Sequence, residues 1–310
     1  MPKRRPSSSR ARAGVPVARG GKSAAQGCGP APRSVSPAAK LERLEKIVAR
    51  CDSALVAFSG GVDSTFLLSV AKDVLGERLL AVTAASPVVQ PDEVAGAKRL
   101  AKKLGVEHEI IHTNEVMEER FCSNPPERCY YCKETLFSKL TALAGERDLG
   151  CVLEASNADD TGDYRPGLRA VKELGVRSPL IEAGLTKAEI RALSRERNLP
   201  TWNKPALACL ASRFPYGERI TVEKLDRVLK GEKYILSLGF RSCRLRSHGK
   251  LARVEVPEDE IERLLEAGLR RRIAARLKKL GFQYITVDLE GYRTGSMNET
   301  LPVATRKARA

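Results

Sequence analysis

The sequence lacks any run of 18 apolar residues, so we expect no segment that spans a membrane. Histidine is scarce, with 3 in 310 residues, which leaves little material for a metal site built on imidazoles. The start of the chain also has no apolar stretch of the kind that a secretory signal needs. We therefore expect a cytoplasmic protein whose 8 cysteines are reduced thiols rather than disulfides.

Acidic residues are absent from positions 1–39, which hold eight basic residues and are rich in Pro, Gly, Ala and Ser. These eight make up half of the formal net charge of +16, so the rest of the chain carries only the other half. The segment shows no helical or strand period, and we expect a disordered basic tail. A solvated tail, a targeting peptide and a nucleic-acid-binding arm all remain compatible with this composition.

Apolar segments alternate with amphipathic ones over residues 40–215. The segments "SALVAF", "LLAVTA", "HEIIHT" and "CVLEAS" have the pattern of buried strands, and helical patterns separate them. Such alternation predicts right-handed crossovers and a doubly wound parallel sheet of the α/β class. Residues 216–310 instead predict a smaller two-layer α/β domain, and we place the boundary near residues 214–220.

A glycine-rich turn, "SGGVDS", follows the first predicted strand and begins a helix. Amides at a helix start attract anions, and glycines let the backbone approach oxygen closely. The turn is not a Walker A loop, which needs GxxxxGK[ST]. It resembles the pyrophosphate loop of the N-type ATP pyrophosphatases, which implies adenylation with release of pyrophosphate. On that resemblance ATP is held by Ser59, Gly60, Gly61, Asp63 and Ser64, and Asp63 also binds Mg²⁺.

A Cys-x-x-Cys motif, Cys129 and Cys132, lies in "PPERCYYCKETLF". By itself the motif is compatible with half of a zinc site, a redox disulfide, a ligand pair for an iron-sulfur cluster, or coincidence. A zinc site needs two more ligands, but the sequence has no second such motif and few histidines. The Asn-Pro-Pro that precedes it predicts a loop, where a thioredoxin-like motif would need a helix start.

Further segments strengthen the resemblance to a single family. They are "RCYYCK", "DYRPGLRA", "WNKPALACLASRFPYG", "EKYILSLGF", "RLRSHGKLARVEVP" and "GYRTGSMN". Together they resemble the LarE family of ATP-dependent sulfur transferases, over about residues 40–302. The resemblance implies that ATP adenylates a carboxylate of pyridinium-3,5-dicarboxylate mononucleotide and that sulfide then replaces AMP. The thiocarboxylate product belongs to the synthesis of the nickel-pincer nucleotide cofactor.

The family has two kinds of member, which differ in their cysteines. One kind gives up the sulfur of a single cysteine, which becomes dehydroalanine; the other holds a [4Fe-4S] cluster on three cysteines and carries an extra sulfide on its open iron. Cys129, Cys132 and Cys209 match the three-cysteine pattern. The sacrificial cysteine falls instead on Ala208. The resemblance therefore implies the cluster type, in which three thiolates bind three irons.

Other residues match family positions near the sulfur centre and the substrate. Cys209, Ser212, Arg213 and Glu232 are the implied catalytic residues. The implied clamp for the substrate phosphate consists of Arg244, Arg246 and Glu255, the two arginines sharing one strand face. We expect Cys51, Cys151 and Cys243 to be structural, Cys122 to be a spare thiol and Cys28 to lie in the tail. "NADD", Asn157–Asp160, is either part of the nucleotide site or a polar loop.

Two other functions use some of the same features. A tRNA thiolase shares the loop and the cluster, but needs RNA-binding modules that the folded part does not show. An RNA-binding module that acts through the basic tail is the alternative of another class. For the transferase we expect a mononucleotide substrate and a separate sulfide source. We also expect a homo-oligomer, in which the C-terminal domain serves substrate binding or oligomerisation. We expect neither nucleic acid nor a membrane as a partner.

Overall fold

A computed structural model describes residues 35–162, 164–205, 208–293 and 295–302. The chain divides into two units, residues 1–35 and 36–310, and the features described here belong to the second. The predicted tail, except for its last residues, lies outside the described part of the chain. In the described part, no helix is both long and apolar enough to cross a membrane.

The first element, α1 (Pro37–Val48), begins inside the segment that the sequence assigned to the tail. The Ser36 side chain accepts a hydrogen bond from the Ala39 amide, and Pro37 occupies the first helical position. Both features stabilise a helix start. The folded chain therefore begins about one helical turn earlier than predicted.

The predicted doubly wound sheet is present, with four parallel strands in the order β3-β2-β1-β4. The strands are β1 (Ala54–Ala57), β2 (Leu79–Ala85), β3 (Glu107–His112) and β4 (Cys151–Leu153). Alternate residues of β1 enter different cores: Val56 packs with one cluster and Leu55 with another. The sheet is thus covered on both faces, as parallel sheets require.

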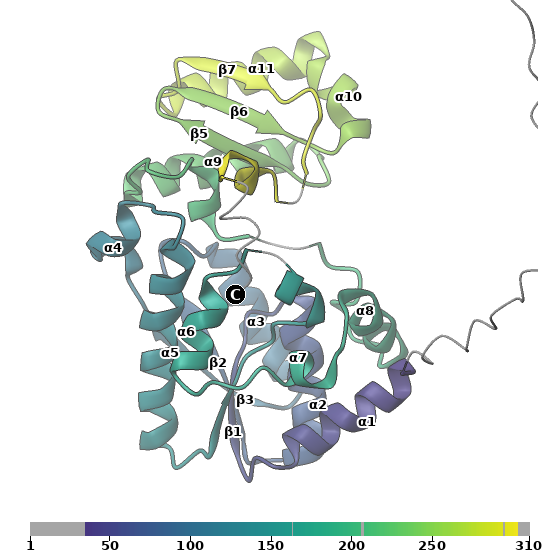
Figure 1. The fold of residues 1–310 in the computed structure, drawn as a ribbon. Coiled ribbons are helices and arrows are strands. Elements are labelled where there is room, and N and C mark those ends of the chain that lie inside the picture. Colours follow the sequence, from purple (N-terminus) through teal and green to yellow (C-terminus); the bar gives the residue numbers. More distant parts are fainter. Residues whose placement is uncertain (1–34, 163, 206–207, 294, 303–310) are drawn as a thin grey trace, which may run out of the picture. The chain divides into compact units, whose positions relative to one another are not determined.

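Helices from different parts of the chain supply the two cores. The first core contains residues of α1, α2 (Val62–Leu75), α3 (Pro91–Lys103), α7 (Pro179–Ala183) and α8 (Lys187–Glu196). The second contains residues of α5 (Arg128–Glu146) and α6 (Gly167–Glu173). Figure 1 shows this arrangement about the sheet. The short helix α4 (Glu119–Cys122) precedes α5.

A second, three-stranded sheet follows in the order β5-β6-β7, as the change of pattern after residue 215 predicted. Its strands are β5 (Arg244–His248), β6 (Leu251–Glu255) and β7 (Tyr284–Val287), and its helices are α9 (Val222–Ser237), α10 (Ile261–Leu265) and α11 (Ala267–Lys279). Strands β5 and β6 are antiparallel, whereas β6 and β7 are parallel. Val228, Leu245, Val254 and Leu277 share its core, so α9 and α11 pack on the sheet.

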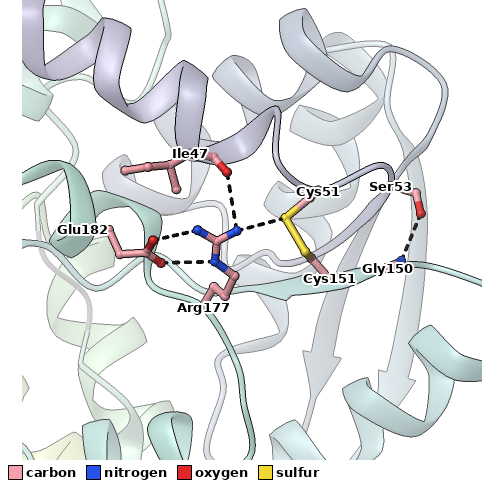
Figure 2. The surroundings of a disulfide bond; sticks show 7 residues. All are labelled: Ile47, Cys51, Ser53, Gly150, Cys151, Arg177 and Glu182. Carbon is pink, nitrogen blue, oxygen red and sulfur yellow. Dashed lines mark hydrogen bonds and ion pairs between the residues drawn. A yellow bond between two sulfur atoms is a disulfide. The ribbon is translucent and has the colours of Figure 1, made fainter.

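The expectation of reduced thiols is wrong for one pair, because Cys51 and Cys151 form a disulfide. Parallel pairing of β1 with β4 sets Ala54 opposite Cys151, and Cys51 lies just before β1. Figure 2 shows the disulfide with Arg177 and Glu182 beside it. The Arg177 guanidinium donates to the Cys51 sulfur at 3.4 Å and pairs with Glu182 at 2.7 Å. The two cysteines are 100 residues apart, so sequence spacing could not reveal their contact. The other described cysteines are free.

Candidate functional site

The predicted phosphate turn, Ser59–Ser64, connects β1 to α2 and is called the PP-loop below. Gly60 has a φ of 66°, and a Cβ there would lie 3.2 Å from the Ala97 backbone, so glycine is required. Gly61 caps α2, and no side chain bonds the first amides of the helix. The hydroxyls of Ser59 and Ser64 lie 3.0 Å apart beside them. The loop therefore offers amides and hydroxyls to an anion.

Two adjoining cavities of about 530 and 410 Å³ lie over the PP-loop. Their linings share residues, Ser59 and Asp63 among them, so we treat them as one nucleotide cavity. Its walls include the ends of β1 and β2 and the residues that follow β4. Carboxyl ends of parallel strands are the usual ligand position in such sheets. Cys132 and Cys209 line the same cavity, which brings the predicted phosphate and sulfur residues together.

Asp63 lies in the first turn of α2, with Oδ2 at 2.6 Å from Lys187 Nζ. Its Oδ1 atom is buried and has no hydrogen-bond partner in the described part of the chain. Burial raises the pKa of Asp63, although the Lys187 ammonium acts in the opposite direction. A buried carboxylate oxygen without a partner is the kind of ligand that Mg²⁺ accepts. Asp63 therefore fits the predicted role, and a bound Mg²⁺ would neutralise phosphate charge there.

The polar segment Asn157–Asp160 also lies on the wall of the nucleotide cavity. Asp159 Oδ2 accepts the Lys187 amide at 2.9 Å, and Asp160 Oδ1 pairs with Arg165 at 2.8 Å. The segment therefore lies where a bound nucleotide would meet it, and its part in nucleotide binding stays a prediction.

The Cys-x-x-Cys motif is not in a loop, contrary to the sequence prediction. Cys129 and Cys132 occupy the first turn of α5, where a spacing of three residues places them on one helix face. Proline restricts the conformation of the residue before it, but it is tolerated where a helix starts. The two prolines precede α5, and the Arg128 amide donates to the Pro125 carbonyl in a turn that leads into the helix. Cys209 immediately precedes the 3₁₀ helix Leu210–Arg213. All three thiols are free.

The three thiols are neighbours. Surrounding protein atoms raise the pKa of Cys129 and of Cys132, and the nearby Cys209 thiol acts in the same direction on both. In the described part of the chain, no three His, Cys, Asp or Glu side chains converge where one metal ion could bind. A cluster differs from a single ion because its separate irons bind separate thiolates. Of these thiols, Cys132 and Cys209 line the nucleotide cavity, and Cys129 lies close enough to interact with both.

Arg213 and Glu232, two predicted catalytic residues, are buried against each other. The Arg213 side chain is 0% exposed, and its Nε and Nη2 bond the two Glu232 carboxylate oxygens at 2.9 and 3.0 Å. Its Nη1 donates to the carbonyls of Ala208 and Cys209 at 2.7 and 3.0 Å. Ser212 Oγ also contacts Nη1 and donates to the Cys209 carbonyl. Arg213 thus holds the main chain at Ala208 and Cys209, and its predicted catalytic role stays a prediction.

The predicted phosphate clamp lies on β5 and β6, and it is buried rather than exposed. Arg246 bonds Glu255 through two contacts of 2.9 Å and donates to the Ser212 carbonyl at 2.8 Å. The Arg244 guanidinium lies 4.8 Å from the centre of the Tyr292 ring. A cavity of about 160 Å³ beside this cluster is lined by residues that include Ser212, Arg246, His248, Arg253 and Arg293.

Sequence reasoning missed two lysines, Lys187 and Lys204, that line the nucleotide cavity. Lys187 is the first residue of α8 and follows the N-cap Thr186. The helix dipole disfavours a lysine at that position, so its presence there is a sequence signal for an anionic ligand. No local pattern marks Lys204. Of the remaining cysteines, Cys122 and Cys243 are buried, which confirms a core position for Cys243.

Comparisons with known proteins agree with this site. The Asparagine synthase family matches residues 42–139, which include the PP-loop. The uncharacterized protein slr1717 of Synechocystis sp. is 45% identical over 262 residues, 84% of this chain and 98% of the relative. The pyridinium-3,5-bisthiocarboxylic acid mononucleotide synthase of Lactiplantibacillus plantarum is 41% identical over 250 residues, 80% of this chain and 90% of the relative. The chain therefore belongs to the LarE family of ATP-dependent sulfur transferases.

Proposed function

We propose that this ATP-dependent sulfurtransferase converts pyridinium-3,5-dicarboxylate mononucleotide into a thiocarboxylate for the nickel-pincer cofactor. The observation that carries the proposal is the nucleotide cavity, which is lined by the PP-loop and by the thiols of Cys132 and Cys209. A relative named for a pyridinium bisthiocarboxylic acid mononucleotide supports the substrate. The two halves of the reaction, activation and sulfur insertion, would share this cavity.

In the first half, a carboxylate oxygen of the substrate attacks the α-phosphorus of ATP, and the bond to the β-phosphate breaks. Pyrophosphate leaves with the bonding electron pair, and an acyl adenylate remains. The amides at the start of α2 and the hydroxyls of Ser59 and Ser64 would hold the leaving phosphates. Asp63 would hold the Mg²⁺ that balances their charge.

In the second half, sulfide attacks the activated acyl carbon, and AMP leaves with the electrons of the carbon–oxygen bond. Cys129, Cys132 and Cys209 would hold the [4Fe-4S] cluster, which when bound supplies a soft sulfur nucleophile without consuming the protein. Arg213 would fix the main chain at Cys209 through its two carbonyl contacts. Ala208, at the position of the sacrificial cysteine, provides no sulfur of its own.

The substrate is anionic, and the cavity lined by Ser212 and Arg246 offers guanidinium groups. Ser212 connects this cavity to the Cys209 segment, because its hydroxyl donates to the Cys209 carbonyl. Arg253 and Arg293 keep 37% and 43% of their side chains exposed, so they can meet a phosphate. Arg246 would contribute to the wall of this substrate site, and Glu255 would hold the Arg246 guanidinium in place. The location of the site beside Ser212 would bring a carboxylate towards Cys209.

The test is anaerobic turnover after reconstitution with iron and sulfide. ATP and the mononucleotide should yield AMP, pyrophosphate and the thiocarboxylate over many cycles, with a broad visible absorption from the cluster. Cys129→Ser, Cys132→Ser and Cys209→Ser should lose the absorption and the thiocarboxylate, while Cys122→Ser serves as a matched control. A single metal-free turnover that converts one cysteine to dehydroalanine would contradict the cluster mechanism.

A further inference from the structure

Two lysines from outside the PP-loop reach into it. Lys187 Nζ lies 2.6 Å from Asp63 Oδ2, and Lys204 Nζ donates to the Gly60 carbonyl oxygen at 2.8 Å. Both lysines line the cavity of about 410 Å³ together with Ser59 and Gly61. Two ammonium groups therefore lie beside the amides that the proposed function assigns to the leaving phosphates.

The position of Lys187 is unfavourable for the helix that carries it. It is the first residue of α8, next to the positive end of the helix dipole. The start of α8 is already stabilised by a capping box between Thr186 and Glu189, which does not involve the Lys187 side chain. The Lys187 side chain thus adds positive charge where α8 begins. An anionic ligand would be stabilised by the Lys187 ammonium and by the positive end of the α8 dipole.

Lys204 is hydrogen-bonded to a neutral group. Its ammonium donates to the Gly60 carbonyl, and the Glu93 carboxylate, which lines the same cavity, interacts with it electrostatically. A half-buried ammonium that donates to a carbonyl would gain from a second, charged acceptor. Because that carbonyl belongs to the PP-loop, a phosphate bound at the loop would lie within reach of Lys204.

One helix fixes both lysines. Arg191, on α8 four residues after Lys187, donates to the carbonyls of Trp202 and Lys204, both at 2.8 Å. The main chain of Lys204 is therefore tied to the helix that begins with Lys187. Lys187, Arg191 and Lys204 thus form a frame beside the PP-loop, in which the two lysines bond the loop and Arg191 bonds the main chain of Lys204.

We propose that Lys187 and Lys204 bind the β- and γ-phosphates of ATP, exchanging Asp63 and Gly60 for phosphate oxygens, and that Arg191 is a positioning residue for Lys204. The proposal rests on the proposed use of ATP. As the bond between the α-phosphorus and the bridging oxygen breaks, negative charge grows on the departing pyrophosphate. Two fixed ammonium groups would stabilise that charge.

The experiment measures binding of inorganic pyrophosphate and of AMP to the full chain by titration calorimetry in the presence of Mg²⁺. Lys187→Met and Lys204→Met should each weaken pyrophosphate binding by about tenfold or more, because each removes a charge-assisted hydrogen bond. AMP lacks the two outer phosphates, so its affinity should change little. Lys230→Met, at an exposed lysine paired with Asp226 on α9, should bind both ligands like the unchanged protein.

Arg191→Met should weaken pyrophosphate binding and lower the rate of AMP formation without changing AMP affinity, and Arg191→Lys should restore part of the loss. Lys187→Gln and Lys204→Gln, checked by circular dichroism, separate this effect from misfolding. Wild-type affinity for pyrophosphate in the lysine variants would overturn the inference while leaving the sulfurtransferase assignment intact. Failure of the unchanged chain to bind either ATP or pyrophosphate would overturn both.

Discussion

Arg213 heads the set of largest fully buried side chains in the described part of the protein, ahead of every phenylalanine and leucine. A buried guanidinium is stable only when its charge and donors are matched, and Glu232 provides two oxygens for it. Glu232 also accepts the Leu245 amide at 2.9 Å, which links the pair to β5. The pair thus connects the Cys209 segment to the second sheet.

Replacing Arg213 alone should be strongly destabilising. In Arg213→Met the Glu232 carboxylate would remain buried without its partner, and we expect a loss of about 3–5 kcal/mol in the free energy of unfolding. Urea denaturation measures it. The double variant Arg213→Met with Glu232→Gln should recover much of the stability but not the sulfur transfer, since the carbonyls of Ala208 and Cys209 lose their donor. Full activity in a stable double variant would show that Arg213 does not position Cys209.

His108 supports the PP-loop from β3. The Thr83 hydroxyl donates to the Phe58 carbonyl at 2.6 Å, so the His108 Nε2, 2.8 Å away, must donate to Thr83. Burial, with the Lys98 charge, lowers the pKa of His108 below its usual 6.5. The folded state therefore binds a proton less readily than the unfolded state.

The sign of the pH effect follows from that shift. Because the folded pKa is depressed, the contribution of His108 to stability is present above about pH 6.5 and is lost as the pH falls towards the folded pKa. Urea unfolding between pH 7.5 and roughly pH 5 should show falling stability for the unchanged protein. In His108→Gln the fall should be smaller. An identical slope in the two proteins would mean that His108 does not titrate differently on unfolding.

At the scale of elements, two helical glycines give a matched pair of predictions. A Cβ at Gly231 in α9 would lie 2.3 Å from Leu245 Cδ2 and 3.0 Å from Leu277 Cδ2, whereas a Cβ at Gly145 in α5 meets nothing within 4 Å. Gly231→Ala should therefore destabilise by about 1–2 kcal/mol, because overpacking outweighs helix propensity. Gly145→Ala should stabilise by about 0.5–1 kcal/mol. Urea unfolding of both variants decides it, and a stabilised Gly231→Ala would show that α9 can move away from β5.

Elements were predictable where the signal is local. The alternation of buried strands with amphipathic helices, and the glycine turn between β1 and α2, could be predicted because each depends on residues close in sequence. The loop prediction is wrong at the start of α5, because Pro125 and Pro126 are compatible with a loop but proline also precedes helices. The burial of Arg246 was also not predictable, because its partner Glu255 lies on the neighbouring strand.

At the scale of the whole molecule, other unpredicted features join distant segments. The contact of Lys204 with Gly60 spans 144 positions, and that of Lys187 with Asp63 spans 124. Such contacts depend on the packing of α8 against α2, which sequence periodicity does not specify. Family resemblance predicted a role for Cys129, Cys132 and Cys209, but it gave no indication of the lysines beside the PP-loop.

The disulfide is the longest-range covalent constraint in the described structure, and it leads to the last prediction. It closes a loop of 100 residues that contains β2, β3 and the PP-loop. Closing a loop of that length restricts the unfolded chain, so Cys51→Ser with Cys151→Ser should lower the free energy of unfolding by about 3–5 kcal/mol. Cys122→Ser, at a buried free cysteine, is the matched control.

Cys51 is 1% exposed, so a mild reductant that keeps the three site thiols reduced should leave this disulfide intact. Alkylation of the denatured protein followed by mass spectrometry should then add two labels fewer than after full reduction, and peptide mapping should locate the difference at Cys51 and Cys151. Two results together would refute the disulfide as a constraint on the fold. These are alkylation of every cysteine in protein purified with mild reductant, and an unchanged free energy of unfolding in the double serine variant. Retention of the disulfide would instead mean that one chain maintains an oxidised pair beside β1 while its site cysteines stay free to bind a cluster.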